Sequence, residues 1–377
     1  MRRILLLTVL AVFATLSVSC GAVRPAKEAA VEKHDIENAG ARKFLEEVNY
    51  TDTSYTVSFA RDYKHDYGAN DRPLPVKISW QGKPASKVIL STSPRFSETI
   101  EVQCSESPAE IYNLIPDVTY YYRVMGTDGK VIRSGSVMPV GPLRMINGVT
   151  ANMRDLGGWK AEGGHIAYGK LYRGARFSSR MPESGKDIFL NQLGISVDLD
   201  LRGIKDSEAN VGPVIEGVEY LKLPVEKNLG RGTGNTEELY QQAIRSIIGW
   251  LGEGRAVYFH CAGGADRTGT LAFLIEALLG VSENDMSKDY ELTTFDGMNT
   301  RLRNFRATEQ ETHILYETVT RLRQFGYPEV SDIHELAVRW ATTRHSDIVA
   351  PLTMDEIGLL RKYLIVKDCL IQSTEPL

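Results

Sequence analysis

The sequence predicts a small all-β sandwich followed by a larger α/β domain whose central, mostly parallel sheet is flanked by helices. Three observations support this: short β-prone runs up to about residue 140, strands alternating with helices beyond it, and one Gly-rich loop that joins a strand to a helix. The 377 residues suffice for two or three domains. With 42% hydrophobic and 24% charged residues the chain is not wholly disordered, and a net charge of −4 argues against a nucleic-acid binder.

Residues 1–19 have the features of a secretory signal. Two arginines precede the apolar run 4–16, which is too short to cross a bilayer core of roughly 30 Å. Cys20 follows small residues and resembles the lipidated cysteine of a bacterial lipoprotein box, although Ser17 stands where Leu is usual. We therefore expect an exported protein, lipid-anchored to a bacterial membrane on its periplasmic side or at the cell surface. Plain cleavage or an uncleaved anchor is the alternative.

Residues 20–49 are rich in Ala and charge, and we expect them to form a linker between the lipid and the folded body, helical at its end. Four cysteines in this length exclude a disulfide scaffold. Export places the later cysteines in an oxidising compartment. Cys104 and Cys369 either pair there or remain buried thiols.

Residues 50–140 are predicted to form the sandwich. The run 120–124, the turn Asp128-Gly129 and the run 130–132 together indicate a β-hairpin. Residues 114–122 (LIPDVTYYY) resemble a segment of fibronectin type III domains, in which a tyrosine hydroxyl ties a corner between the sheets. The aromatic cluster either packs in the core or forms a face for a carbohydrate or protein partner.

Residues 141–377 are predicted to form the α/β domain. Its strands are expected at residues 195–201, 220–223 and 255–259. The third strand leads through the Gly-rich loop into a helix over 270–279, which Gly280 ends. Two further helices are predicted from capping pairs, Ser282 with Asp285 and Thr353 with Glu356. In a parallel sheet, ligands bind at the carboxyl ends of the strands, so the loop after residue 259 is the candidate site.

The loop combines a nucleophile, a cation and small residues that let the backbone curl. Its residues are His260, Cys261, Ala262, Gly263, Gly264, Ala265, Asp266, Arg267 and Thr268. Inward N–H groups and the following helix N-terminus form an anion nest. Near these groups and Arg267 the pKa of Cys261 should fall far enough to give a thiolate nucleophile, while Thr268 donates a hydrogen bond to the sulfur. The planar fork of Arg267 suits two phosphoryl oxygens.

This loop matches the H-C-x5-R-[ST] signature, and the chain therefore resembles the cysteine-dependent protein-tyrosine phosphatases, in particular their bacterial tyrosine/serine branch. Further matching segments are residues 152–158, 171–174, 200–202 and 289–292. The resemblance implies a phosphocysteine intermediate, no metal and no cofactor. It also implies a phosphorylated protein or small phosphomonoester as substrate, with inositol phosphates and phosphoinositides as the alternative. A lipoprotein that only binds a phosphorylated ligand is the rival from another class.

The general acid is left open among three carboxyl groups. We favour Asp266, inside the loop, because the bacterial branch uses this position; Glu226 and Asp200 are the alternatives. Asp200 could instead be only a structural partner of Arg202. Members of the branch often carry Lys at the position of Ala265, so a weaker preference for polyanionic substrates is expected.

Two supporting features are also predicted. Arg154 and Asp155 precede two glycines, and we expect them in a turn, where they either orient the phosphate loop or pair with other structural groups. Residues 227–234 contain two cations on a Gly-rich stretch and form either a substrate lid or an ordinary surface loop.

Overall fold

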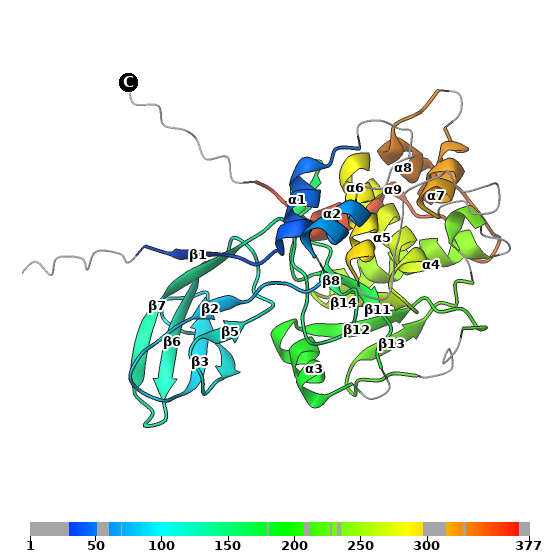
Figure 1. The fold of residues 1–377 in the computed structure, drawn as a ribbon. Helices are drawn as coiled ribbons and strands as arrows, with labels where there is room; N and C mark the ends of the chain where they lie inside the picture. The colour runs from blue at the N-terminus through cyan, green and yellow to red at the C-terminus, as the bar shows by residue number, and fades with distance from the viewer. Residues whose placement is uncertain are drawn as a thin grey trace, which may run out of the picture. The chain divides into compact units, whose positions relative to one another are not determined.

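The fold is taken from a computed structural model, drawn in Figure 1. It describes residues 30–50, 60–68, 70–178, 181–206, 212–226, 228–231, 235–296, 314–326 and 329–368. The predicted signal 1–19, the lipidation residue Cys20 and the cysteine Cys369 lie outside these ranges, so the predictions about them stay predictions. Within these ranges, every helix is too short or too polar to cross a bilayer.

The first part of the fold consists of two β-sheets that share one apolar core. The larger sheet has the order β1-β7-β6-β3-β4 and the smaller one pairs β2 with β5. The strands are β1 (Glu32–Asp35), β2 (Val76–Ile78), β3 (Ala85–Ser91), β4 (Ile100–Gln103), β5 (Ala109–Ile111), β6 (Tyr120–Gly126) and β7 (Val131–Val140). Val88 and Val124 from the larger sheet and Val76 and Ile111 from the smaller one lie in this core.

The predicted hairpin and tyrosine corner are both present. Strands β6 and β7 pair antiparallel, and Gly129 in the turn between them has a positive φ of 75°. The Tyr120 hydroxyl accepts a hydrogen bond of 3.1 Å from the Ile115 backbone N–H, which ties the approach to β6 onto the strand. The closer likeness to fibronectin type III domains stays a prediction.

The structure corrects the extent of the predicted linker and of the sandwich. Strand β1 pairs parallel with β7, and helix α1 (Ala39–Glu47) packs into the core of the α/β domain, so residues 32–47 belong to the folded body. Helix α2 (Ala60–Tyr67) occupies the start of the predicted β region, whose own strands begin at Val76. The apolar residues Ala41, Phe44 and Leu45 have helical i, i+3, i+4 spacing, but a stripe this short is masked by the surrounding charges.

The second part is built on a five-stranded sheet of order β13-β12-β14-β11-β8, parallel except for β8. Its strands are β8 (Arg154–Asp155), β11 (Leu171–Ala175), β12 (Ile195–Asp200), β13 (Glu219–Lys222) and β14 (Ala256–Cys261). A small antiparallel sheet contains β9 (Lys160–Ala161), β10 (Gly164–Ile166) and β15 (Ile365–Val366). The predicted strands β12, β13 and β14 are confirmed.

Helices cover both faces of the five-stranded sheet (Figure 1). They are α3 (Glu183–Asp187), the π-helix η1 (Ile188–Gln192), the 3-10 helix η2 (Leu229–Arg231), α4 (Thr236–Gly252), α5 (Asp266–Leu279), α6 (Glu283–Glu291), the 3-10 helix η3 (Leu292–Phe295), α7 (Ile314–Arg323), α8 (Ile333–Thr342) and α9 (Met354–Leu364). On β14, Val257 and Phe259 face the core that holds α5, whereas Tyr258 packs against Phe189 on the opposite face. Successive side chains of β14 thus enter the cores on opposite faces of the sheet, as expected for its central strand, and α5 packs on one of these faces.

The predicted helix ends are confirmed. Gly280 ends α5 with a φ of 76°, a conformation that favours glycine. The Ser282 side chain caps α6, and Thr353 with Glu356 forms a reciprocal capping box at the start of α9.

Candidate active site

The Gly-rich loop connects the end of β14 to the start of α5, where the sequence places the site. Strand β14 ends at Cys261, and the next helix begins at Asp266. Gly264 has a φ of 66°, and a Cβ there would lie 2.7 Å from the Ala175 backbone nitrogen. The loop therefore lies directly against the end of β11, and only glycine fits this close approach.

Cys261 is buried, and its surroundings favour the thiolate. Burial by itself raises the pKa of the thiol, but the positive charge of Arg267 and the neighbouring Thr268 hydroxyl and backbone N–H outweigh it and hold the pKa below its ordinary value. This is the direction that the sequence predicts. A thiolate at the N-terminus of α5 is the state needed for nucleophilic attack.

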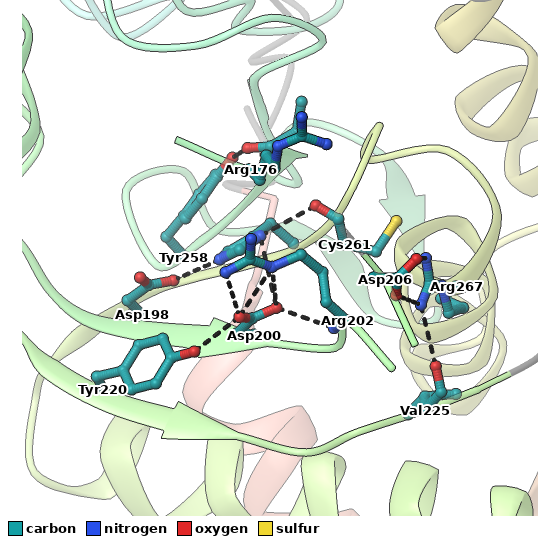
Figure 2. A network of polar contacts seen from close by, with 12 residues as sticks. Arg176, Asp198, Asp200, Arg202, Asp206, Tyr220, Val225, Tyr258, Cys261 and Arg267 are labelled. Atoms are coloured by element: carbon teal, nitrogen blue, oxygen red, sulfur yellow. Dashed lines mark hydrogen bonds and ion pairs between the residues drawn. The ribbon is translucent and has the colours of Figure 1, made fainter. Parts of the chain in front are cut away.

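Arg267 is held by a carboxylate that the sequence analysis missed. Its Nη1 and Nη2 atoms donate to the two oxygens of Asp206, the second over 3.2 Å, and Nη1 also donates to the Val225 carbonyl over 3.1 Å (Figure 2). Asp206 follows β12 and Val225 follows β13, so the arginine bridges the loops after two neighbouring strands. The position of Asp206 just beyond a strand end, at the ligand-binding edge of the sheet, was the signal available.

His260 is fixed between a carboxylate and the nucleophile's own backbone. Its Nε2 lies 3.0 Å from Asp198 Oδ1, and its Nδ1 lies 3.1 Å from the Cys261 carbonyl oxygen. Burial lowers the pKa of the imidazole, but the charge of Asp198 outweighs it, so the pKa is raised. With an acceptor at each nitrogen, His260 is well suited to remain an imidazolium beside Cys261.

Asp200 is a structural partner of Arg202. Arg202 donates to both carboxylate oxygens, and the Tyr220 hydroxyl donates to Oδ2 over 2.7 Å (Figure 2). Burial raises the pKa of Asp200, but these bonds and the charge of His260 hold it below its ordinary value. These contacts support the structural alternative for Asp200, and its role as general acid stays a prediction.

The two other candidate acids lie in different settings. Asp266 opens α5, is partly exposed, and accepts a hydrogen bond of 3.4 Å from the Tyr290 hydroxyl. Glu226 is exposed, and its Oε1 accepts a hydrogen bond of 2.7 Å from the Ile204 backbone N–H. Asp266 also interacts electrostatically with the Cys261 thiol, whose pKa it raises. Asp266 is thus within electrostatic reach of the nucleophile, and Glu226 joins two loops.

Arg154 and Asp155 lie in strand β8 and not in the predicted turn, because Arg154 pairs with Arg173 on β11 across the strand edge. Arg154 reaches the loop indirectly: its Nη1 donates 2.7 Å to Asn152 Oδ1, and Asn152 Nδ2 donates 3.1 Å to the Gly263 carbonyl. Asp155 instead accepts a hydrogen bond of 3.1 Å from Arg144. Of the two predicted residues, Arg154 supports the loop and Asp155 supports the fold.

A buried carboxylate, Asp289, joins the two arginines behind the loop. Arg154 Nε donates to it over 2.9 Å, and Arg173 Nη1 donates to its other oxygen. Arg173 Nη2 also donates 3.0 Å to the Gly264 carbonyl. The sequence analysis included Arg173 and Asp289 in matched segments but gave neither a role, because their pairing links positions more than a hundred residues apart.

The predicted lid falls partly outside the described residues, at Lys227 and 232–234. Between them, Leu229 is buried in the core of the α/β domain, and the Asn228 side chain lies 3.4 Å from Glu317 on α7. Residues 228–229 are thus packed against the body of the domain. The choice between lid and surface loop stays a prediction for the remainder.

Comparison with known proteins gives a family model that covers more than half of the chain. The model described as "Tyrosine phosphatase family" matches residues 146–356. A protein of Cupriavidus necator named as a tyrosine-protein phosphatase is 28% identical over 164 residues, which cover 37% of this chain and 59% of that protein.

Two solved structures show partial similarity. TpbA of P. aeruginosa has 16% identity and a TM-score of 0.31, covering 47% of this chain and 89% of that one. The catalytic domain of the PP-IP phosphatase SIW14 from S. cerevisiae has 17% identity and a TM-score of 0.27, covering 37% and 78%. At these scores the solved structures carry no argument about the site.

Proposed function

Since the chain belongs to the tyrosine phosphatase family, we propose that it hydrolyses phosphomonoesters through a phosphocysteine intermediate, as a protein-tyrosine or dual-specificity phosphatase. The observation that carries the proposal is the buried Cys261 thiol at the end of β14, whose pKa is held down by Arg267 and by the Thr268 hydroxyl and backbone N–H at the start of α5. A loop in this position binds a phosphoryl group and places its phosphorus in front of the sulfur.

In the first step the Cys261 thiolate attacks phosphorus and forms the S–P bond as the P–O bond to the leaving group breaks. Asp266 gives its proton to the departing oxygen. In the second step Asp266 takes a proton from water, whose oxygen attacks phosphorus and breaks the S–P bond. Inorganic phosphate leaves, and the hydrogen bond from Thr268 stabilises the thiolate that is released.

Asp266 is preferred over Glu226 as the acid because it stands on the first turn of the helix that follows the loop. Glu226 accepts a hydrogen bond from the Ile204 N–H, which gives it a structural role between the loops after β12 and β13. Asp266→Asn should lower turnover far more for an alkyl phosphate than for nitrophenyl phosphate, since only the poor leaving group needs the proton. The same selectivity in Glu226→Gln, with Asp266→Asn unaffected, would overturn the assignment.

Turnover of nitrophenyl phosphate by the purified chain tests the proposal as a whole. Cys261→Ser should abolish turnover, and a chelator should leave the unsubstituted protein unaffected. Equal, metal-dependent turnover in both proteins would contradict the mechanism. Tight binding of a phosphorylated ligand without any turnover would favour the rival, a phospho-ligand-binding lipoprotein.

The alternative substrate class is inositol phosphates or phosphoinositides. Between Cys261 and Arg267 the loop carries Ala262, Gly263, Gly264, Ala265 and Asp266, so it supplies no second cation for a second phosphate. This favours a substrate with one phosphoryl group at the site. A panel of phosphotyrosine peptides, phosphoserine peptides and inositol phosphates decides between the classes.

We also propose that the enzyme is exported and held at the membrane by acyl chains on Cys20, and that the sandwich is of the fibronectin type III kind. The apolar run before Cys20 supports the first proposal. Metabolic labelling with a fatty acid should mark the unsubstituted protein and not Cys20→Ala. Equal labelling, or release of both into the soluble fraction, would contradict the anchor.

A further inference from the structure

We propose that Asp206 is the positioning residue for Arg267: its carboxylate takes one edge of the guanidinium and thereby turns the other edge toward the phosphoryl group. The inference rests on the proposed function, because it assigns Arg267 to the substrate. It adds a residue outside the signature loop to the machinery of phosphate binding.

The donors of Arg267 divide into two sets. A guanidinium has five N–H groups in a rigid plane. Nη1 donates to Asp206 Oδ2 and to the Val225 carbonyl, and Nη2 donates to Asp206 Oδ1 over 3.2 Å. Among the contacts that the described residues make, the Nε–H and the second N–H of Nη2 are left. These two N–H groups point from the same edge of the planar guanidinium and form a fork that matches two phosphoryl oxygens.

Asp206 is itself held in place. Its Oδ2 accepts a hydrogen bond of 2.6 Å from the Gly203 N–H, which folds the loop after β12 back on itself. The same loop is tied to the segment after β13 by the bond from the Ile204 N–H to Glu226. A Cβ on Gly203 would lie 2.8 Å from the Glu226 carboxyl carbon, so the two loops are in close contact. The carboxylate is therefore a fixed support for the arginine.

Asp206 has two opposing effects on the binding of an anion. Asp206 places a negative charge near a site for an anion, which opposes binding, but it removes the need for each substrate to order the long arginine side chain. We infer that the ordering of Arg267 outweighs the repulsion between Asp206 and the anion. Both oxygens of Asp206 bind one edge of the guanidinium, which leaves its other edge oriented for the phosphate. Asp206 acts through Arg267, and the proton transfers do not involve it.

Alkylation of Cys261 separates this role from a merely structural one. Iodoacetate carries a carboxylate that Arg267 can bind, whereas iodoacetamide is neutral, so the ratio of their inactivation rates reports on the arginine without any turnover. We expect the unsubstituted protein to prefer iodoacetate, Asp206→Asn to lose about tenfold of that preference, and Asp206→Glu to keep part of it. The iodoacetamide rate should stay within about twofold in all three. Asp187→Asn, an exposed carboxylate on α3, is the matched control.

Turnover gives a second readout. Asp206→Asn should raise the KM for nitrophenyl phosphate and the inhibition constant of orthovanadate by about tenfold, with a smaller fall in kcat. An unchanged or increased iodoacetate preference in Asp206→Asn would overturn the proposal and make Asp206 a competing counter-ion. If Asp206→Asn does not fold, Asp206→Ser is measured in the same way. An unsubstituted protein with neither iodoacetate preference nor turnover would refute the proposed function instead.

Discussion

Replacing Asp289 by Asn removes a carboxylate that accepts hydrogen bonds from both Arg154 and Arg173. All three side chains are buried, and each arginine donates to a different oxygen of Asp289. Breaking a buried ion pair costs about 3–5 kcal/mol, because the remaining charge keeps its desolvation cost without its partner. Here one substitution strands two guanidinium groups, so we expect the free energy of unfolding to fall by about 5 kcal/mol, a third or more of the usual 5–15 kcal/mol.

A neighbouring acid does not compensate. Glu276 is buried on α5, and burial, together with the charge of Asp289, raises its pKa well above the ordinary value, which disfavours its charged form. Neither of its carboxyl oxygens has a hydrogen-bond partner among the described residues. The two arginines therefore depend on Asp289 for a counter-charge.

Urea unfolding at pH 7, followed by fluorescence, measures the effect as a shift of the midpoint at constant slope. Asp187→Asn serves again as the exposed control and should change the free energy of unfolding by less than about 0.5 kcal/mol. A loss below about 1 kcal/mol in Asp289→Asn would refute the reasoning, since an exposed pair is worth that much.

Three further predictions concern other parts of the chain. Burial raises the pKa of Glu37 to about 8, so between pH 4.5 and 8 the folded state holds a proton that the unfolded chain releases. The free energy of unfolding therefore falls by up to about 1.4 kcal/mol for each unit by which the pH rises. Urea unfolding across this range should show a smaller fall in Glu37→Gln. Gly264→Ala should lower turnover about a hundredfold, because the added Cβ pushes the loop away from β11. Gly254→Ala is the control: Gly254 has a φ of 77° and open space around it, so this change should lower stability and leave turnover unchanged. Equal turnover in the two variants would contradict the prediction. Tyr120→Phe should lower the free energy of unfolding by about 1 kcal/mol through the lost bond to the Ile115 N–H, and an unchanged urea midpoint would show that the corner bond is not needed.

Local signals predicted much of the fold. The strands β12, β13 and β14, the hairpin of β6 and β7 and the capped ends of α5, α6 and α9 are each marked by residues a few positions apart. Helix α2 was missed, and α1 was expected only as the helical end of a linker. Their apolar stripes are short and meet a core formed more than two hundred residues later; Lys288, for example, donates a hydrogen bond of 2.7 Å to the Leu45 carbonyl. Such contacts leave no periodic signal in the short helices themselves.

The site divides in the same way. The loop around Cys261 was predictable because its nucleophile, cation and helix N-terminus are contiguous. The groups that hold it come from separate strands: Asp206 meets Arg267 across 61 positions, and Arg173 meets Asp289 across 116. The role of Asp200 also depended on tertiary structure, because only the packed strands show that Arg202 and Tyr220 occupy its oxygens.

The path of residues 32–50 limits where the protein can be cut into fragments. Strand β1 fills an edge of one sheet, and nine residues later Phe44 is wholly enclosed among the helices of the other part. A recombinant fragment begun at residue 141 would open a hole at that phenylalanine and strip the Asn284 side chain of the Tyr50 backbone N–H that it binds at 2.6 Å. A stable fragment that contains the α/β domain should therefore start ahead of Glu32, so the strands of the first part and the α/β domain have to be expressed together.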